Sequence, residues 1–95
     1  MIFNLVTSKI KKYYIINLLQ IAHNKGILGR KKVAMLLSLA ETGKLVCKIC
    51  GQPVQLHKAS CDHKIPISKG GSKWNVRNYQ LAHKGCNWRK GDKIL

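Results

Sequence analysis

The sequence predicts an α+β fold, in which a basic helical hairpin over residues 1–46 precedes a small domain over residues 47–95 that is stabilised by a bound metal ion. Three observations support this prediction. Apolar residues recur at helical spacing in the first region. From Cys47 onward the chain changes to short segments separated by Gly and Pro. A Cys-x-x-Cys pair in this second region returns later as His-x-x-Cys, a spacing typical of metal ligands.

The first region contains two predicted helices. One covers residues 8–25 and ends at Gly26, and the other covers residues 29–42 and ends at Gly43. We expect each helix to bury one apolar face against its neighbours. The predicted buried residues are Ile10, Tyr14, Ile15, Leu18, Ile21 and Ala22 on the first helix, and Val33, Leu36, Leu37 and Ala40 on the second. We expect no functional role for His23.

The second region is predicted to run in the order strand, loop, strand, helix. The first strand ends near His63, and a Gly-rich turn follows at residues 69–72. The second strand covers residues 78–82, and a short helix begins at residue 84 and ends near residue 93.

The charge of the chain indicates its partner. Eighteen Lys and Arg residues against three acids give a formal charge of +15, which a polyanion such as nucleic acid would neutralise. Arg30, Lys31 and Lys32 begin the second predicted helix, where the helix dipole disfavours cations. Either these side chains contact phosphate or they form a solvated basic face.

The small number of acids limits the chemistry. Only Glu41, Asp62 and Asp92 carry side-chain carboxylates, which excludes carboxylate-bridged two-metal nucleases and glycosidases with paired acids. Asp62 is expected to be the only acid near a functional site. The apolar stretch at residues 13–22 is interrupted and too short to cross a bilayer, so we expect no membrane partner. Metal-binding cysteines favour a reducing intracellular compartment, either the cytoplasm or an organelle matrix.

A structural zinc ion is predicted from the paired motifs. Its four ligands would be Cys47, Cys50, His83 and Cys86. Four protein ligands fill the tetrahedral positions of Zn²⁺, so this ion would stabilise the fold and take no part in chemistry. An alternative with Cys61 in place of His83 would give an all-thiolate site. We favour Cys61 as a packed, inert thiol, because alternation along the strand places it on the same face as His63.

From Cys47 onward the chain resembles the HNH endonuclease family. The resemblance rests on four motifs in the family's order: Asp62-His63-x-x-Pro66, the Gly70-Gly71 loop, Asn78, and Cys86-Asn87-x-x-Lys90. It covers about half of the chain and implies a ββα-metal fold with one catalytic divalent ion, separate from the zinc. Asn87 stands where the family's final histidine is common, which makes this chain similar to the H-N-N variant.

The resemblance also implies roles for individual residues. His63 would be the general base that takes a proton from the attacking water, and Asn78 would hold the loop between the strands. Asp62 and Asn87 would ligate the catalytic ion, for which Mg²⁺ and Mn²⁺ are the suitable cations because both prefer oxygen ligands. The predicted contacts to the nucleic acid backbone are Lys64, Arg89 and Lys90, together with Arg30, Lys31 and Lys32 of the helical hairpin.

Two functions are carried forward from the sequence. The first is a metal-dependent endonuclease that nicks or cleaves DNA, with DNA favoured over RNA, in a setting such as a phage or a mobile element. The second is a catalytically silent, zinc-stapled nucleic-acid-binding protein derived from such a nuclease, for example a subunit of a ribosome or another ribonucleoprotein. A homodimer and a larger nucleoprotein assembly both remain open. Trp74, in the loop, would either stack on a base or pack over the loop.

Overall fold

The computed structural model describes residues 2–95 of the chain, with side chains from residue 11 onward. Its helices and strands are α1 (Ile2–Asn24), α2 (Arg30–Thr42), β1 (Ala59–His63), β2 (Tyr79–His83) and α3 (Lys84–Lys90). Short 3-10 turns cover Leu56–Lys58, Ile67–Lys69 and Val76–Asn78. The predicted α+β class and the order strand, loop, strand, helix are therefore confirmed.

The buried face of α1 overlaps the predicted one only in part: Ile15 packs against the core and Ala22 is half-buried, as expected. Leu19 is 6% exposed, whereas Leu18 and Ile21 are about half exposed, at 48% and 50%, and Tyr14 is also exposed. The side chain of Ile10 lies outside the described residues. Because apolar residues surround much of this helix, periodicity alone did not select the buried face. Contacts with α2 and the turn before β2 select the face that carries Leu19.

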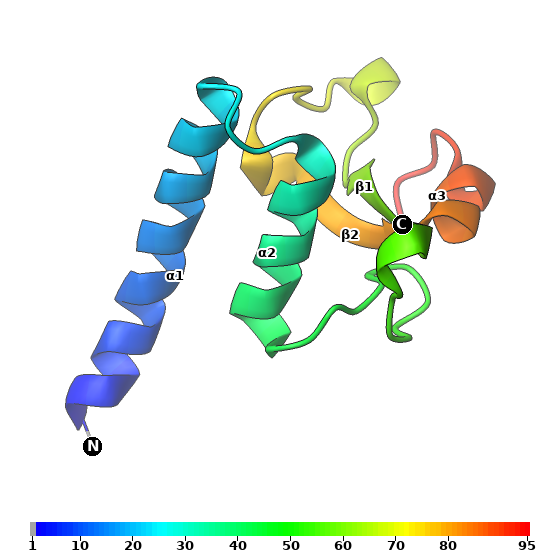
Figure 1. Cartoon of the computed structure of the whole chain (residues 1–95). Helices are drawn as coiled ribbons and strands as arrows, with labels where there is room; N and C mark the ends of the chain where they lie inside the picture. Colours follow the sequence, from blue (N-terminus) through cyan, green and yellow to red (C-terminus); the bar gives the residue numbers. More distant parts are fainter. Residues whose placement is uncertain (1) are drawn as a thin grey trace.

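Helix α2 lies between α1 and the sheet (Figure 1). Val33 and Leu37 are buried as predicted, but Leu36 and Ala40 are exposed. Ala34 and Ser38 are buried in their place, because α2 contacts both α1 and the sheet and its buried face is correspondingly displaced. Since α2 packs on the strands, it shares a core with the second region, and the division into domains at residues 46 and 47 stays a prediction.

The two strands form an antiparallel sheet between α2 and α3 (Figure 1). Their register pairs Ala59 with His83 at one end and His63 with Tyr79 at the other. The two histidines with predicted roles therefore lie at opposite ends of the same small sheet. Helix α3 starts directly after β2, so its first residues stay near the His83 end.

Two groups of buried side chains hold these elements together. One joins α2 to the strands and the cysteine-bearing loop, through residues such as Ala34, Val54 and Leu81. The other joins α1 and α2 to β2, through residues such as Leu19, Val33 and Tyr79. Among the described residues, neither α1 nor any other helix combines the length and the hydropathy required for a bilayer span.

Candidate metal centre and catalytic cavity

Four side chains from three segments meet at one end of the sheet. They are Cys47, Cys50, His83 and Cys86, and their ligand atoms all lie within 4.8 Å of one another. Cys47 and Cys50 come from the loop before β1, His83 ends β2, and Cys86 is in α3. Such a set of three thiols and one imidazole fits the tetrahedral coordination of a structural metal such as zinc.

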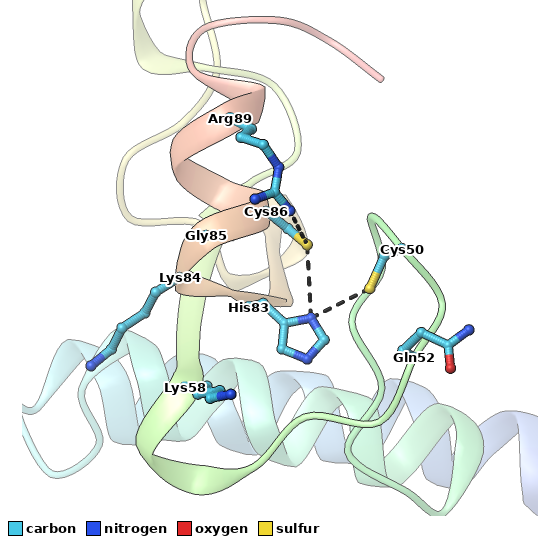
Figure 2. A pocket seen from close by; sticks show the side chains of 8 residues that line it. All are labelled: Cys50, Gln52, Lys58, His83, Lys84, Gly85, Cys86 and Arg89. Carbon is cyan, nitrogen blue, oxygen red and sulfur yellow. Dashed lines mark hydrogen bonds between the residues drawn. The ribbon is translucent and has the colours of Figure 1, made fainter.

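The imidazole of His83 is oriented for this role. Its Nε2 lies 3.0 Å from the carbonyl oxygen of Pro53, and a carbonyl only accepts hydrogen bonds, so Nε2 carries the hydrogen. The lone pair is then on Nδ1, which lies 3.3 Å from the sulfur of Cys50 and 3.8 Å from that of Cys86 (Figure 2). A second hydrogen bond that fixes the tautomer is a common feature of histidine metal ligands.

Backbone amides surround the sulfur of Cys47. The amides of Cys50 and His83 donate to it at 3.5 Å and 3.4 Å. Burial raises the pKa of Cys47, but these amides, together with that of Ile49 and the Cys50 side chain, lower it to about 6 overall. The lowered pKa favours the thiolate form of Cys47 at neutral pH, which is the form that binds metal.

Cys61 does not belong to this cluster. The four grouped ligands include His83 and leave Cys61 out, which excludes the all-thiolate alternative. Burial raises the pKa of Cys61 to about 12, so its thiol stays protonated. This is the inert role expected from the sequence.

A second site lies beside α3 and β1. A cavity of about 220 Å³ is lined by Asp62, His63 and Asn87, which the sequence places in the catalytic site. Asp92 lines the same cavity. The expectation that Asp62 is the only acid near a candidate site is therefore wrong. Asp92 lies two residues after Lys90, which ends the last motif of the family resemblance. Its position beside the cavity depends on how the chain turns at Gly91 after α3.

His63 is held by a backbone carbonyl. Its Nε2 lies 3.3 Å from the carbonyl oxygen of Lys73, and its ring stands edge-on to that of Tyr79, with centroids 5.3 Å apart. Because the carbonyl accepts, Nε2 carries the hydrogen and the lone pair is on Nδ1. The geometry thus gives His63 one nitrogen for orientation and one that can accept a proton.

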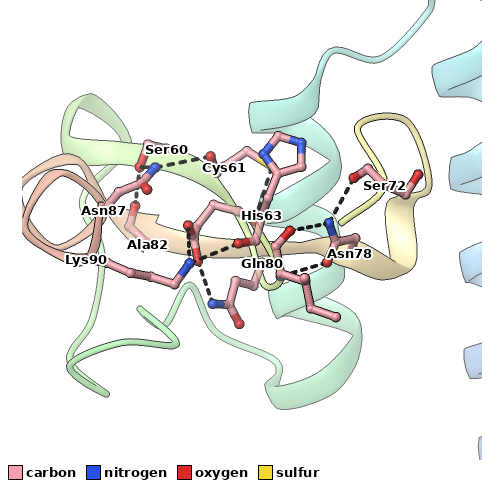
Figure 3. Close-up of polar contacts among 11 residues, drawn as sticks. Ser60, Cys61, His63, Ser72, Asn78, Gln80, Ala82, Asn87 and Lys90 are labelled. Carbon is pink, nitrogen blue, oxygen red and sulfur yellow. Dashed lines mark hydrogen bonds and ion pairs between the residues drawn. The ribbon is translucent and has the colours of Figure 1, made fainter. Parts of the chain in front are cut away.

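The loop between the strands is closed by Asn78 (Figure 3). Its Nδ2 donates to the carbonyls of Ile65 and Ser72 at 2.9 Å and 2.8 Å, and its Oδ1 accepts from the amide of Ile65 at 2.9 Å. Gly71 allows this closure, because a Cβ atom there would lie 1.8 Å from the carbonyl oxygen of Ile65. These bonds join the segment after His63 to the segment that leads to Lys73.

Asp62 is buried and its two oxygens have different partners. Oδ1 accepts from the ammonium of Lys90 at 3.1 Å, and Oδ2 accepts from the amide of Gln80 at 2.7 Å. Lys90 is 3% exposed and also donates to the carbonyl of His63 at 3.0 Å. This location differs from the predicted phosphate contact of Lys90, because a buried ammonium cannot reach a strand on the surface. Lys90 instead fixes Asp62 and the end of β1.

The donor set is compatible with a hard divalent cation. Asn87 donates through Nδ2 to the hydroxyl of Ser60 and the carbonyl of Cys61, both at 3.2 Å, which leaves its Oδ1 as a donor atom for a cation (Figure 3). Each oxygen of Asp62 keeps a second lone pair beside its hydrogen bond. Carboxylate and amide oxygens are ligands that Mg²⁺ and Mn²⁺ accept, with water completing the shell.

The sequence did not reveal the part played by His23. Its Nε2 lies 2.9 Å from the hydroxyl of Tyr79, and that hydroxyl donates at 2.7 Å to the same Lys73 carbonyl that holds His63. Its Nδ1 lies 2.9 Å from the carbonyl of Leu28. No local motif indicated this network, because His23 and Tyr79 are far apart in the sequence and meet only in the fold.

The remaining predicted phosphate contacts lie on the surface. Lys64 and Arg89 are exposed, as are Arg30, Lys31 and Lys32 at the start of α2. Arg89 also donates to the sulfur of Cys86 at 3.4 Å, so one of its nitrogens is directed to the metal cluster. Arg89 thus lies beside the metal cluster, whereas Lys64 lies with Glu41 and Lys48 and does not line the cavity of Asp62 and His63.

Comparison with known proteins agrees with this geometry. The family model of the HNH endonucleases matches residues 47–93, which include both the metal cluster and the cavity lined by Asp62, His63 and Asn87. Residues 47–93 form an HNH endonuclease domain. Searches of curated proteins and of solved structures found no match to the chain. Membership in this family indicates a nuclease-type or nucleic-acid-binding role, and the metal cluster is compatible with either.

Proposed function

We propose that this HNH domain hydrolyses phosphodiester bonds in DNA with His63 as the general base. The observation that supports this most directly is the orientation of His63. The Lys73 carbonyl holds Nε2, while the side chain lines one cavity with Asp62 and Asn87. A base with a fixed tautomer beside oxygen donors is the arrangement that phosphodiester hydrolysis requires.

In this proposal the side chains divide the work. Nδ1 of His63 accepts a proton from the water that attacks phosphorus, and the Asn78 hydrogen bonds keep the loop that carries the Lys73 carbonyl in place. Asp62 and Asn87 would hold Mg²⁺ or Mn²⁺, and the bound ion would supply charge stabilisation to the phosphoryl and leaving oxygens. Lys90 keeps the Asp62 carboxylate in one orientation.

The surface cations bind the polyanionic substrate. Lys64 follows the general base in the sequence, and Arg89 lies on α3 one turn from Cys86. Arg30, Lys31 and Lys32 extend the positive surface to the start of α2. Binding through phosphate contacts weakens as salt is raised, and this holds equally for DNA and RNA, so substrate choice is tested by cleavage.

The direct test is a plasmid nicking assay. Zinc-loaded protein is incubated with supercoiled DNA and Mg²⁺ or Mn²⁺, and in parallel with a structured RNA. We expect nicking of DNA that falls by about 100-fold or more in His63→Ala, because general base catalysis contributes roughly 10²–10⁴-fold. His57→Ala is the matched control, since His57 is also a histidine of the second region but is exposed and does not line the cavity.

One structural observation favours the binding-only alternative. Both oxygens of Asp62 already have partners inside the protein, and one of these is a buried ammonium that competes with a cation for the carboxylate. If the folded, zinc-loaded protein binds nucleic acid but nicks no faster than His63→Ala with either metal, the nuclease proposal is wrong. The domain would then be a zinc-stapled nucleic-acid-binding protein.

A further inference from the structure

Trp88 combines a firmly held backbone with an exposed ring. The residue is 84% exposed, the highest value among the large hydrophobic side chains of the described residues. An indole ring loses hydrophobic stabilisation when it is left in water, and tryptophan is highly buried on average. Local packing therefore does not account for this side chain.

The neighbours of Trp88 on α3 are anchored on both sides. Cys86 belongs to the metal cluster, Asn87 donates to Ser60 and to the backbone of β1, and Lys90 forms the buried ion pair with Asp62. The helix that displays Trp88 is thus tied to β1 and to the metal-binding loop. The backbone of Trp88 is therefore already ordered before a ligand packs on the ring, and only the side chain has to be fixed.

The surroundings of Trp88 indicate the class of ligand. With Ser60, Lys84 and Asn87, the ring lines a hollow of about 370 Å³, and Asn87 also lines the catalytic cavity. Lys84 continues into a second hollow of about 430 Å³, where Lys58 and Arg89 lie (Figure 2). Among the side chains that the structure describes, no acid lines either hollow. An aromatic ring beside a row of cations matches a nucleotide, which offers a flat base and an anionic phosphate.

We propose that Trp88 stacks on an unpaired nucleobase of the strand that enters the catalytic cavity, while Lys84 contacts the phosphate of that nucleotide. The proposal depends on the nucleic-acid partner of the proposed function but not on cleavage. It adds a base-binding position next to the catalytic cavity. Base stacking on an aromatic side chain tolerates every base, so this position supports binding without selecting a sequence.

The test measures binding in a His63→Ala background, so that cleavage does not interfere. Zinc-loaded protein is titrated with a single-stranded thymidine oligonucleotide and with an abasic oligonucleotide of equal length and charge. We expect Trp88→Ala to bind the thymidine strand about 5- to 100-fold more weakly, and Trp88→Phe to stay within about threefold of the parent. The parent should lose a similar factor on the abasic strand, whereas Trp88→Ala should bind both strands alike.

Fluorescence provides a second readout, because the chain has two tryptophans. Trp74→Phe leaves Trp88 as the only indole, and its emission should be quenched by the thymidine strand and much less by the abasic strand. Trp88→Phe leaves Trp74, which is 60% exposed with Lys73 Nζ 5.1 Å from its ring, and reports separately whether the thymidine strand also reaches Trp74.

The possible outcomes separate this inference from the nuclease proposal. If Trp88 emission and affinity are the same for both strands, the stacking proposal is overturned even if plasmid nicking succeeds. A change from oligomer to monomer in Trp88→Ala, without an effect on oligonucleotide binding, also overturns it and assigns the ring to a contact between copies of the chain. Stacking that persists in a protein without nicking activity supports the inference and rejects only the nuclease.

Discussion

The two ends of the small sheet carry sites built in opposite ways. At the Ala59–His83 end, four ligand atoms point at one another, and their other contacts come from the backbone and from Arg89. At the His63–Tyr79 end, the side chains face a cavity, and the carboxylate has two protein partners already. The first arrangement matches the four-ligand shell of one metal ion, whereas the second borders an open cavity. A closed set of ligands stabilises the fold, and an open set permits chemistry.

This difference between the two ends predicts that loss of the metal cluster destabilises the fold more than any other change. Replacing Cys47 by Ser, or removing metal with a chelator, should unfold residues 47–93, because a structural zinc ion contributes about 10 kcal/mol or more to a domain whose net stability is roughly 5–15 kcal/mol. Circular dichroism and metal content measure this effect. Cys61→Ser is the control and should retain one metal ion per chain. If Cys47→Ser stays fully folded without metal, the closed site is not a structural one.

Disruption of the buried ion pair between Lys90 and Asp62, at the His63–Tyr79 end, should have the next largest effect on stability. Lys90→Met leaves the Asp62 carboxylate buried without its cation, which should lower the free energy of unfolding by about 3–5 kcal/mol. The double variant Asp62→Asn with Lys90→Met should recover most of this loss, because no unpaired charge remains buried. Urea denaturation measures both variants. Lys48→Met is the control, since the pair of Lys48 with Glu41 is partly exposed and should cost less than about 1 kcal/mol.

If Lys90→Met is as stable as the parent, the carboxylate has another partner in solution. The comparison between the two ends would then change, because the open end would have room for a cation without competition from Lys90. A gain of metal-dependent nicking in Lys90→Met would show the opposite, namely that Lys90 competes with a cation for Asp62 in the parent.

The smallest expected effect concerns the hydroxyl of Tyr79. This group donates to the Lys73 carbonyl that orients His63, so Tyr79→Phe should lower the nicking rate about three- to tenfold while KM changes little. In the proposed mechanism Tyr79 is a positioning residue, because it contacts the Lys73 carbonyl and not the substrate. Loss of the hydrogen bond should also lower stability by about 1 kcal/mol. Tyr14→Phe is the control, because Tyr14 is exposed on α1.

A fall in affinity without a fall in rate would contradict this role of Tyr79. His23→Ala should resemble Tyr79→Phe in a nicking assay, since His23 reaches the same carbonyl only through the Tyr79 hydroxyl. Together, the His23→Ala and Tyr79→Phe variants test whether α1, which carries His23, helps to position His63.

Motifs with fixed local spacing were read correctly from the sequence. The strand that ends at His63, the Gly-Gly loop, and the four residues of the metal cluster all lie where expected. Each of these depends on residues that are close in the chain or on ligands whose chemistry allows few partners. The closure of the loop by Asn78 belongs to the same group, because its partners lie in the loop itself and the backbone of Ile65 approaches Gly71 too closely for any side chain there.

Features that depend on which surfaces meet were not predictable in this way. The buried face of α1, the burial of Lys90, the position of Asp92 and the network from His23 to the Lys73 carbonyl all arise from contacts between distant segments. Charge and hydropathy assign a residue to a class, but the same lysine can lie in solvent or beside a buried carboxylate. Only its neighbours decide between these environments.

The sequence by itself determined the chemistry available to this protein: a cysteine and histidine set for one metal, a single histidine motif for a base, and a large positive charge. The tertiary structure decided how that chemistry is arranged. It separated the two histidines to opposite ends of the sheet, enclosed Asp62 with Lys90, and left Trp88 in solvent. The physical reason is that ligand type and charge are properties of each residue, whereas burial and orientation belong to the packed chain.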